Sequence, residues 1–268
     1  HRPGVTDQLY HYGNALELLS SSGYTWRGFE EQLGRVEFAI LASLFAVVAS
    51  RASGRPRAMI AGAAAAFAAI FGDSLTRATA RIAGRLYFAI SDDALISMRY
   101  ARNFAEGRGL VYNAGEYVDG YSNPLWTLLM VIPHALGVHE GTTTLYVVVF
   151  GGLCLLGAGL LSYAVLEREE VPLPLAVFAF LAIVFDASTF EFAISGLETT
   201  ALTLASAAVI YGTYAKRSWL VATGFVVLAL SRADGSVVAL VLAAWRVRED
   251  KLATSEPLKV VLRRHVGP

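Results

Sequence analysis

The polar segment at residues 91–126 reads SDDALISMRYARNFAEGRGLVYNAGEYVDGYSNPLW, and the rest of the chain is arranged around it. It is a long polar segment within a largely apolar chain, and it holds most of the side chains that could do chemistry. Ser91 and the two aspartates after it predict a helix N-terminus, because a hydroxyl cap and nearby acids suit the free N–H groups of a first turn. This helix is expected to run to about Ala105 and to end before Gly107, which suits the left-handed position after a helix.

The predicted helix places unlike polar groups on one face. At about 100° per residue, Asp92, Ile96, Arg99 and Asn103 share that face, so an acid, a guanidinium and an amide project together. After the helix, residues 110–118 contain two short strand-like runs around a turn-forming segment, which predicts a hairpin.

Segment 91–126 closely resembles the first extracytoplasmic loop of bacterial GT-C membrane glycosyltransferases. The nearest branch is the one that includes the terminal β-(1→2) arabinofuranosyltransferases of cell-wall polysaccharide assembly. Two later segments fit the same family, SGLET at 195–199 and SRADG at 231–235, although the family usually has proline where this chain has Ala233. The resemblance covers roughly residues 86–248 and implies an all-α, multi-pass transmembrane bundle with a helical or hairpin extracytoplasmic loop.

The composition independently indicates a membrane protein. The chain has 268 residues, of which 55% are hydrophobic and 16% charged, and this is too apolar for an ordinary soluble domain. Apolar runs bounded by charges are typical of a multi-pass helical protein. The net charge is zero, so no overall field favours nucleic acid, and Cys154, the only cysteine, excludes an intrachain disulfide or a cysteine metal site.

The part of the chain before the polar segment has a weaker pattern. Residues 1–35 are of unclear role and lack the order of a signal peptide. We expect the GT-C-like domain to cover 36–268, with 73–126 as its first extracytoplasmic loop and with its C-terminal part missing. The apolar runs 36–50 and 58–72 are short for a span of about 20 residues.

Residues 73–85 carry Arg77, Arg81 and Arg85 at four-residue spacing, which predicts an amphipathic interfacial helix.

Further helices are predicted after the polar segment, at 124–138, 143–166, 171–185, 198–214, 218–230 and 235–245. The basic connectors 51–57, 216–217 and 246–251 should lie in the cytoplasm by the positive-inside rule. They can do so together only if 124–138 does not cross the membrane, which its short length and internal Pro133 favour. The acids of 91–126, of 195–199 and of 231–235 would then share the outer face.

Each candidate site residue has a structural alternative. Asp92 and Asp93 are either plain first-turn acids or a general base with a partner that positions it or a cation, and any metal ion would bind there. Arg99 and Asn103 either solvate the helix face or bind lipid headgroups, or Arg99 holds a donor phosphate.

The aromatic and later polar candidates are also open to two interpretations. Asn123 is a candidate substrate-binding residue. Tyr121 and Trp126, on either side of it, fit an interfacial aromatic belt or a surface that stacks on sugar C–H groups. The later candidates either line the site or are unremarkable helix-terminal acids with a local ion pair; they are Glu198, Arg232 and Asp234.

The resemblance implies an inverting glycosyltransferase in the bacterial plasma membrane. It would move a sugar such as arabinofuranose from a polyprenyl-phosphate carrier to a hydroxyl of a cell-envelope polysaccharide on the extracytoplasmic face, with a divalent metal ion as an optional cofactor. The alternatives are a lipid or sugar transporter or flippase, and a non-catalytic scaffold that binds a lipid-linked sugar. Because the interiors of the predicted spans after the polar segment carry no ionisable side chain, the sequence disfavours an ion pathway.

Overall fold

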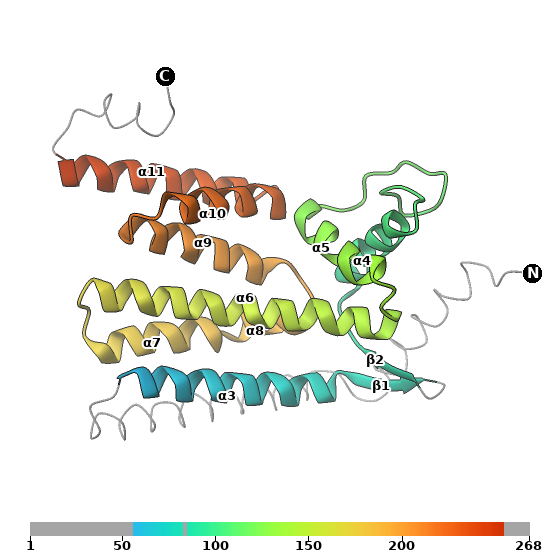
Figure 1. Ribbon diagram of the computed structural model, residues 1–268, viewed down its shortest axis with the longest axis horizontal. Coiled ribbons are helices and arrows are strands. Elements are labelled where there is room, and N and C mark those ends of the chain that lie inside the picture. Colours follow the sequence, from blue (N-terminus) through green and yellow to red (C-terminus); the bar gives the residue numbers. More distant parts are fainter. Residues whose placement is uncertain (1–55, 83–84, 255–268) are drawn as a thin grey trace, which may run out of the picture.

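The computed structural model describes residues 56–82 and 85–254, and Figure 1 shows its arrangement. The predictions for 1–35, for the apolar run 36–50 and for the basic residues before 56 fall outside the described residues. The described part contains nine helices and one two-stranded ribbon. Their bounds are α3 Pro56–Arg77, β1 Thr79–Ile82, β2 Arg85–Phe88, α4 Asp92–Ala105, α5 Pro124–Ala135, α6 Glu140–Arg168, α7 Leu173–Val184, α8 Ala187–Ile194, α9 Thr199–Tyr214, α10 Ser218–Ser231 and α11 Gly235–Thr254.

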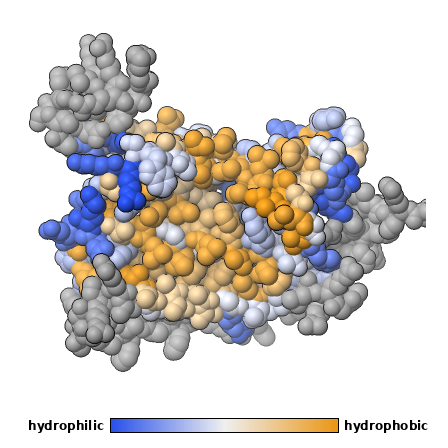
Figure 2. Space-filling model, viewed as in Figure 1, coloured by the Kyte–Doolittle hydropathy of each residue, from blue (hydrophilic) through white to orange (hydrophobic). Residues whose placement is uncertain are grey.

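Two of the described helices are long and apolar enough to cross a membrane. They are Met59–Arg77 within α3 and Gly141–Arg168 within α6, and the pair α7 and α8, bent by 44° at their junction, passes the same test as one broken span. The prediction of an all-α fold is therefore confirmed for the described residues, with two or three helices long and apolar enough to span a membrane. Figure 2 agrees, since hydrophobic residues cover the middle of the molecule and hydrophilic residues gather toward its two ends.

The long helices lie side by side, and the polar segment lies at one end of them (Figure 1). At this end, which we call the site end, α4 and α5 lie together with the ribbon, the α8–α9 junction and the α10–α11 junction. The connectors 169–172 and 215–217 and the last turns of α11 lie at the opposite end. Among the described residues, the acidic segments and the basic connectors 216–217 and 246–251 are thus separated as the topology argument expects.

Helix α4 begins and ends where its sequence predicts. Ser91 is extended, its hydroxyl accepts a hydrogen bond from Ala94 N at 3.3 Å, and the two aspartates occupy the first turn. The helix ends at Ala105, and Gly107 adopts a φ of 76° in the left-handed region that favours glycine.

Two local predictions are wrong. Residues 110–118 form turns and bends without a strand. Side chains of α4 donate to the backbone carbonyls of Val111, Tyr112 and Val118, so these carbonyls are satisfied without a ladder. Two- or three-residue strands alone would add little stability.

The interfacial helix predicted at 73–85 ends at Arg77, where α3 stops. The chain then forms the antiparallel ribbon, with Thr79 opposite Phe88 and Ile82 opposite Arg85, so the hairpin of this loop precedes α4.

Small residues allow the helices behind the site end to approach closely. A Cβ built on Gly224 of α10 would lie 2.6 Å from Val209 Cγ2 and 2.9 Å from Ala205 O, both on α9. Close backbone approach at glycine is a common way for helices to associate in a membrane. This contact fixes α10, which leads directly into the α10–α11 junction.

We predict that Gly224→Ala destabilises the protein, because the backbone carbonyl of Ala205 cannot move aside as a flexible side chain could. The expected loss is about 1–3 kcal/mol, typical of overpacking. Gly62→Ala is the matched control: its Cβ meets nothing within 4 Å, and alanine favours a helix by about 0.5–1 kcal/mol over glycine. Thermal unfolding in detergent measures both, and an equal response of the two variants would contradict this packing.

Candidate functional site

The site is built on a buried carboxylate. Glu198 stands at the α8–α9 junction, and its side chain is only 3% exposed. Its Oε2 accepts a hydrogen bond from Asn123 Nδ2 and its Oε1 accepts one from Arg232 Nη1, each at 2.9 Å. A buried charge is tolerated when it is paired and hydrogen-bonded, so these two contacts explain how Glu198 is accommodated.

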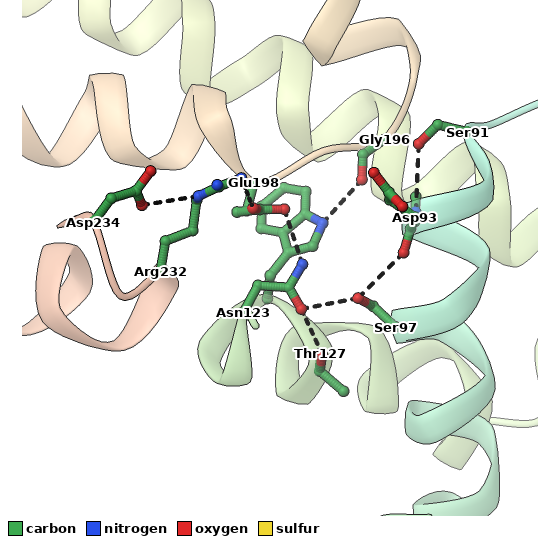
Figure 3. A network of polar contacts seen from close by, with 11 residues as sticks. Ser91, Asp93, Ser97, Asn123, Thr127, Gly196, Glu198, Arg232 and Asp234 are labelled. Atoms are coloured by element: carbon green, nitrogen blue, oxygen red, sulfur yellow. Dashed lines mark hydrogen bonds and ion pairs between the residues drawn. The ribbon is translucent and has the colours of Figure 1, made fainter. Parts of the chain in front are cut away.

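Asn123, immediately before α5, joins three helices through one amide group. Its Oδ1 accepts hydrogen bonds from Ser97 Oγ of α4 at 2.8 Å and from Thr127 Oγ1 of α5 at 2.9 Å. Its Nδ2 donates to Glu198, so every group of the amide points to a defined partner. Figure 3 shows the resulting polar chain, which runs from α4 through Asn123 to Glu198 and Arg232.

Two further hydrogen bonds hold the same helices against the turn between α8 and α9. The indole Nε1 of Trp126 donates to Gly196 O at 2.9 Å, and the backbone N of Ser91 donates to Ser195 O at 3.0 Å. Gly196 has a φ of 76°, and a Cβ there would lie 3.2 Å from the side chain of Ile90. The segment SGLET, which the sequence analysis assigns to the site, is therefore in direct contact with both α4 and α5.

Arg232, at the end of α10, has one buried and one exposed partner. Besides its contact with Glu198, its Nε donates to Asp234 Oδ1 at 2.9 Å. The Arg232 side chain is 40% exposed and that of Asp234 is 65% exposed. The hydrogen bond from this guanidinium holds the pKa of Asp234 below its usual value.

Asp92 and Asp93 are exposed at the first turn of α4. Among the described residues, neither carboxylate takes part in a hydrogen bond or an ion pair. The helix beneath them is fixed, because the hydroxyl of Ser97 contacts both Asp93 O, at 3.4 Å, and Asn123. The two acids thus stand on a tethered helix end with their carboxylates open to solvent.

Arg99 and Asn103 share a face of α4 as predicted, but their contacts run to the following loop. Arg99 Nε donates to Tyr112 O at 2.8 Å, its Nη2 donates to Asn113 Oδ1 at 2.9 Å, and the guanidinium lies 4.4 Å from the Tyr112 ring centroid. Asn103 Nδ2 donates to Val111 O and Tyr112 O. These contacts hold the loop in place, and a ligand-binding role for either residue stays a prediction.

The aromatic candidates differ in access. Trp126 is 2% exposed, so its ring is buried rather than presented for stacking on a sugar. Tyr121 is partly buried, and its ring lies 4.9 Å from that of Tyr100, whose hydroxyl donates to Val118 O. Of the two, Tyr121 is the one with surface available for a ligand.

Sequence reasoning missed two residues of the network, Ser97 and Thr127, and it also missed Tyr100, which holds the neighbouring loop. A signal existed for Ser97, which lies about one turn after the acids on a helix whose buried positions are otherwise mainly apolar. Thr127 follows Asn123 by four residues, a spacing that brings side chains together at a helix start. No comparable signal marked Tyr100, because its partner is a backbone carbonyl of an irregular loop.

The described residues contain no group of three or more His, Cys, Asp or Glu side chains arranged to hold a metal ion. The two carboxylates of Asp92 and Asp93 remain the predicted place for one.

We predict that Asn123→Leu and Asn123→Asp each destabilise the protein. The first leaves buried polar groups without partners, at about 1–3 kcal/mol each, and the second places a second carboxylate against Glu198. The double variant Asn123→Asp/Glu198→Gln exchanges the amide and the carboxylate between the two side chains, so every hydrogen-bond donor keeps an acceptor. It should therefore recover most of the stability that Asn123→Asp loses. Thermal unfolding in detergent decides this, and a double variant no more stable than Asn123→Asp would refute the network.

Comparison with known family models, curated proteins and solved structures finds no match to this chain.

Proposed function

We propose that the protein is an inverting glycosyltransferase of the bacterial plasma membrane. It would transfer a sugar from a polyprenyl-phosphate carrier to a hydroxyl of an extracytoplasmic cell-envelope glycan, and the resemblance of segment 91–126 favours arabinofuranose as that sugar. The observation that carries the proposal is the pair of exposed, unpaired carboxylates of Asp92 and Asp93 at the same end of an apolar bundle as Arg232.

The arrangement suits a substrate that is part lipid and part sugar. The apolar sides of the bundle can lie against an isoprenoid chain in the bilayer, and the polar groups at the site end lie where its head would emerge (Figure 2). An acceptor glycan would reach the same end from the aqueous side. The exposed segment 113–120 borders α4 there and offers the exposed ring of Tyr117 to such an acceptor.

The lack of a hydrogen-bond or ion-pair partner for the two aspartates, among the described residues, supports a role as general base. A carboxylate that is already locked in a salt bridge is a weak proton acceptor, because its charged form is stabilised. Asp92 and Asp93 have no such partner among the described residues, so their carboxylate oxygens are open to an acceptor hydroxyl.

In the proposed reaction, Asp92 or Asp93 takes the proton of the acceptor hydroxyl. The hydroxyl oxygen attacks the anomeric carbon from the face opposite the phosphate and forms the new glycosidic bond. The bond from that carbon to the phosphate oxygen breaks, and polyprenyl phosphate leaves with the electron pair, so the anomeric configuration inverts. A guanidinium at the site end, or a divalent cation at the aspartates, would stabilise the charge on the leaving phosphate.

We predict that Asp92→Asn or Asp93→Asn lowers turnover by about 10² to 10⁴ while donor binding and stability stay near normal. Asparagine keeps the shape of aspartate but accepts no proton at working pH, and an exposed first-turn acid is worth only about 0.3–1 kcal/mol to the helix. Transfer from a polyprenyl-phospho-sugar by the purified full-length protein is the measurement. Asp119→Asn removes an exposed carboxylate of the same loop and should leave turnover unchanged.

Wild-type turnover in both asparagine variants would mean that the pair only stabilises the N-terminus of α4. Donor binding without any transfer by the wild-type protein would instead favour the scaffold alternative.

A further inference from the structure

Arg232 differs from Arg99, Arg102 and Arg108 in how it is held. Arg99 is bound to the loop through Tyr112 and Asn113, and Arg102 and Arg108 both contact Glu106 at the surface. Arg232 is instead anchored from below by a carboxylate that is almost fully buried.

The anchor fixes the direction of the guanidinium. Glu198 cannot move toward solvent without leaving Asn123, and Asn123 is itself held by Ser97 and Thr127. Because the buried carboxylate accepts from Nη1, the edge formed by Nε and Nη2 faces away from it. A guanidinium edge held in this way matches two oxygens of a carboxylate or phosphate.

The partner on that outer edge is replaceable. Asp234 accepts from Nε, but its side chain is 65% exposed, and no described residue accepts from Nη2. An ion pair exposed to solvent contributes little to stability, whereas a buried pair is costly to break. An incoming anion would therefore separate Arg232 from Asp234 and leave the pair with Glu198 intact.

We propose that the Nε–Nη2 edge of Arg232 binds a phosphate-class oxyanion and that Asp234 is the internal counter-ion which this anion displaces. The proposal deepens the proposed function, on which it rests for the identity of the carrier, because a polyprenyl phosphate presents such an oxyanion at the level of the helix ends. Glu198 and Asn123 are then positioning residues: they aim the guanidinium and do not touch the ligand.

The effect of removing Asp234 on ligand binding distinguishes this role from direct binding by Asp234. If Asp234 bound substrate or a metal ion, its removal would weaken binding; as a competitor for Arg232, its removal should strengthen it. The probe is polyprenyl phosphate added to the purified full-length protein in detergent, with the dissociation constant measured at low and high salt. We expect Asp234→Asn to bind about two- to fivefold more tightly, which is the scale of one exposed ion pair. Asp119→Asn, which removes an exposed carboxylate from the loop between α4 and α5, is the matched control and should bind like the wild type.

Arg232 itself is tested in a background that keeps the fold. Arg232→Gln leaves Glu198 buried without its cation, so the double variant Arg232→Gln/Glu198→Gln removes the two charges together. It should bind the probe at least about tenfold more weakly, because a charge-assisted contact is lost, and the effect of added salt on binding should shrink. Unchanged affinity in this double variant, or weaker or unchanged affinity in Asp234→Asn, overturns the proposal.

Two further arms identify the source of the anion and separate this proposal from the glycosyltransferase. If inorganic phosphate competes with the probe, the Nε–Nη2 edge accepts free phosphate. If inorganic phosphate does not compete, and the protein binds polyprenyl phosphate but not polyprenol, the lipid carrier is the ligand. Tighter binding by Asp234→Asn in a protein that transfers no sugar would leave the anion site standing while the transferase assignment fails. If the wild-type protein transfers sugar but Asp234→Asn weakens binding, the transferase assignment would stand and the anion-site proposal would fail.

Discussion

The buried carboxylate of Glu198 is the constraint on which the rest of the site depends. It lies at a chain junction between α8 and α9, and its two partners come from segments far away in the sequence, Asn123 before α5 and Arg232 after α10. Removal of either partner would leave the almost fully buried carboxylate of Glu198 without one of its two hydrogen-bond donors. Three loops are thereby forced to meet at one end of an apolar bundle, and the acids of α4 are brought to the same end through Ser97.

This constraint also explains why α5 stays at the site end. The helix has only 12 residues, its N-terminus is held by Asn123, and Trp126 is bound to the carbonyl of Gly196. Helix α5 packs on α4 at the site end and does not run along the bundle to the opposite end (Figure 1). Segment 91–126 and Glu198 therefore stay at the same end of the bundle, and the shared site follows from this.

Much of this organisation was predictable from the sequence. The hydroxyl and acids at 91–93 define the start of α4, and the positions of the basic connectors, together with the short helix at 124–138, place Glu198 and Asp234 at the same end as Asp92. The hairpin expected at 110–118 was wrong because local strand propensity cannot reveal that side chains of α4 occupy its carbonyls. The partners of Asn123 were also beyond prediction: an Asn-Pro pair indicates a helix start, but the direction of the amide depends on a tertiary contact 75 residues away.

The central claim, that segments 91–126, 195–199 and 231–235 meet on one side of a membrane, is tested most directly by thiol labelling in intact cells. Single cysteines at the exposed positions Asn113 and Ser236 represent the site end, and one at the exposed Ser218 represents the opposite end, all in a Cys154→Ser background. An impermeant reagent added from outside should label the cysteines at 113 and 236 and should reach the one at 218 only after the membrane is opened. Labelling of 113 and 236 from opposite sides would contradict the account, because the contacts of Glu198 with Asn123 and Arg232 could not then exist.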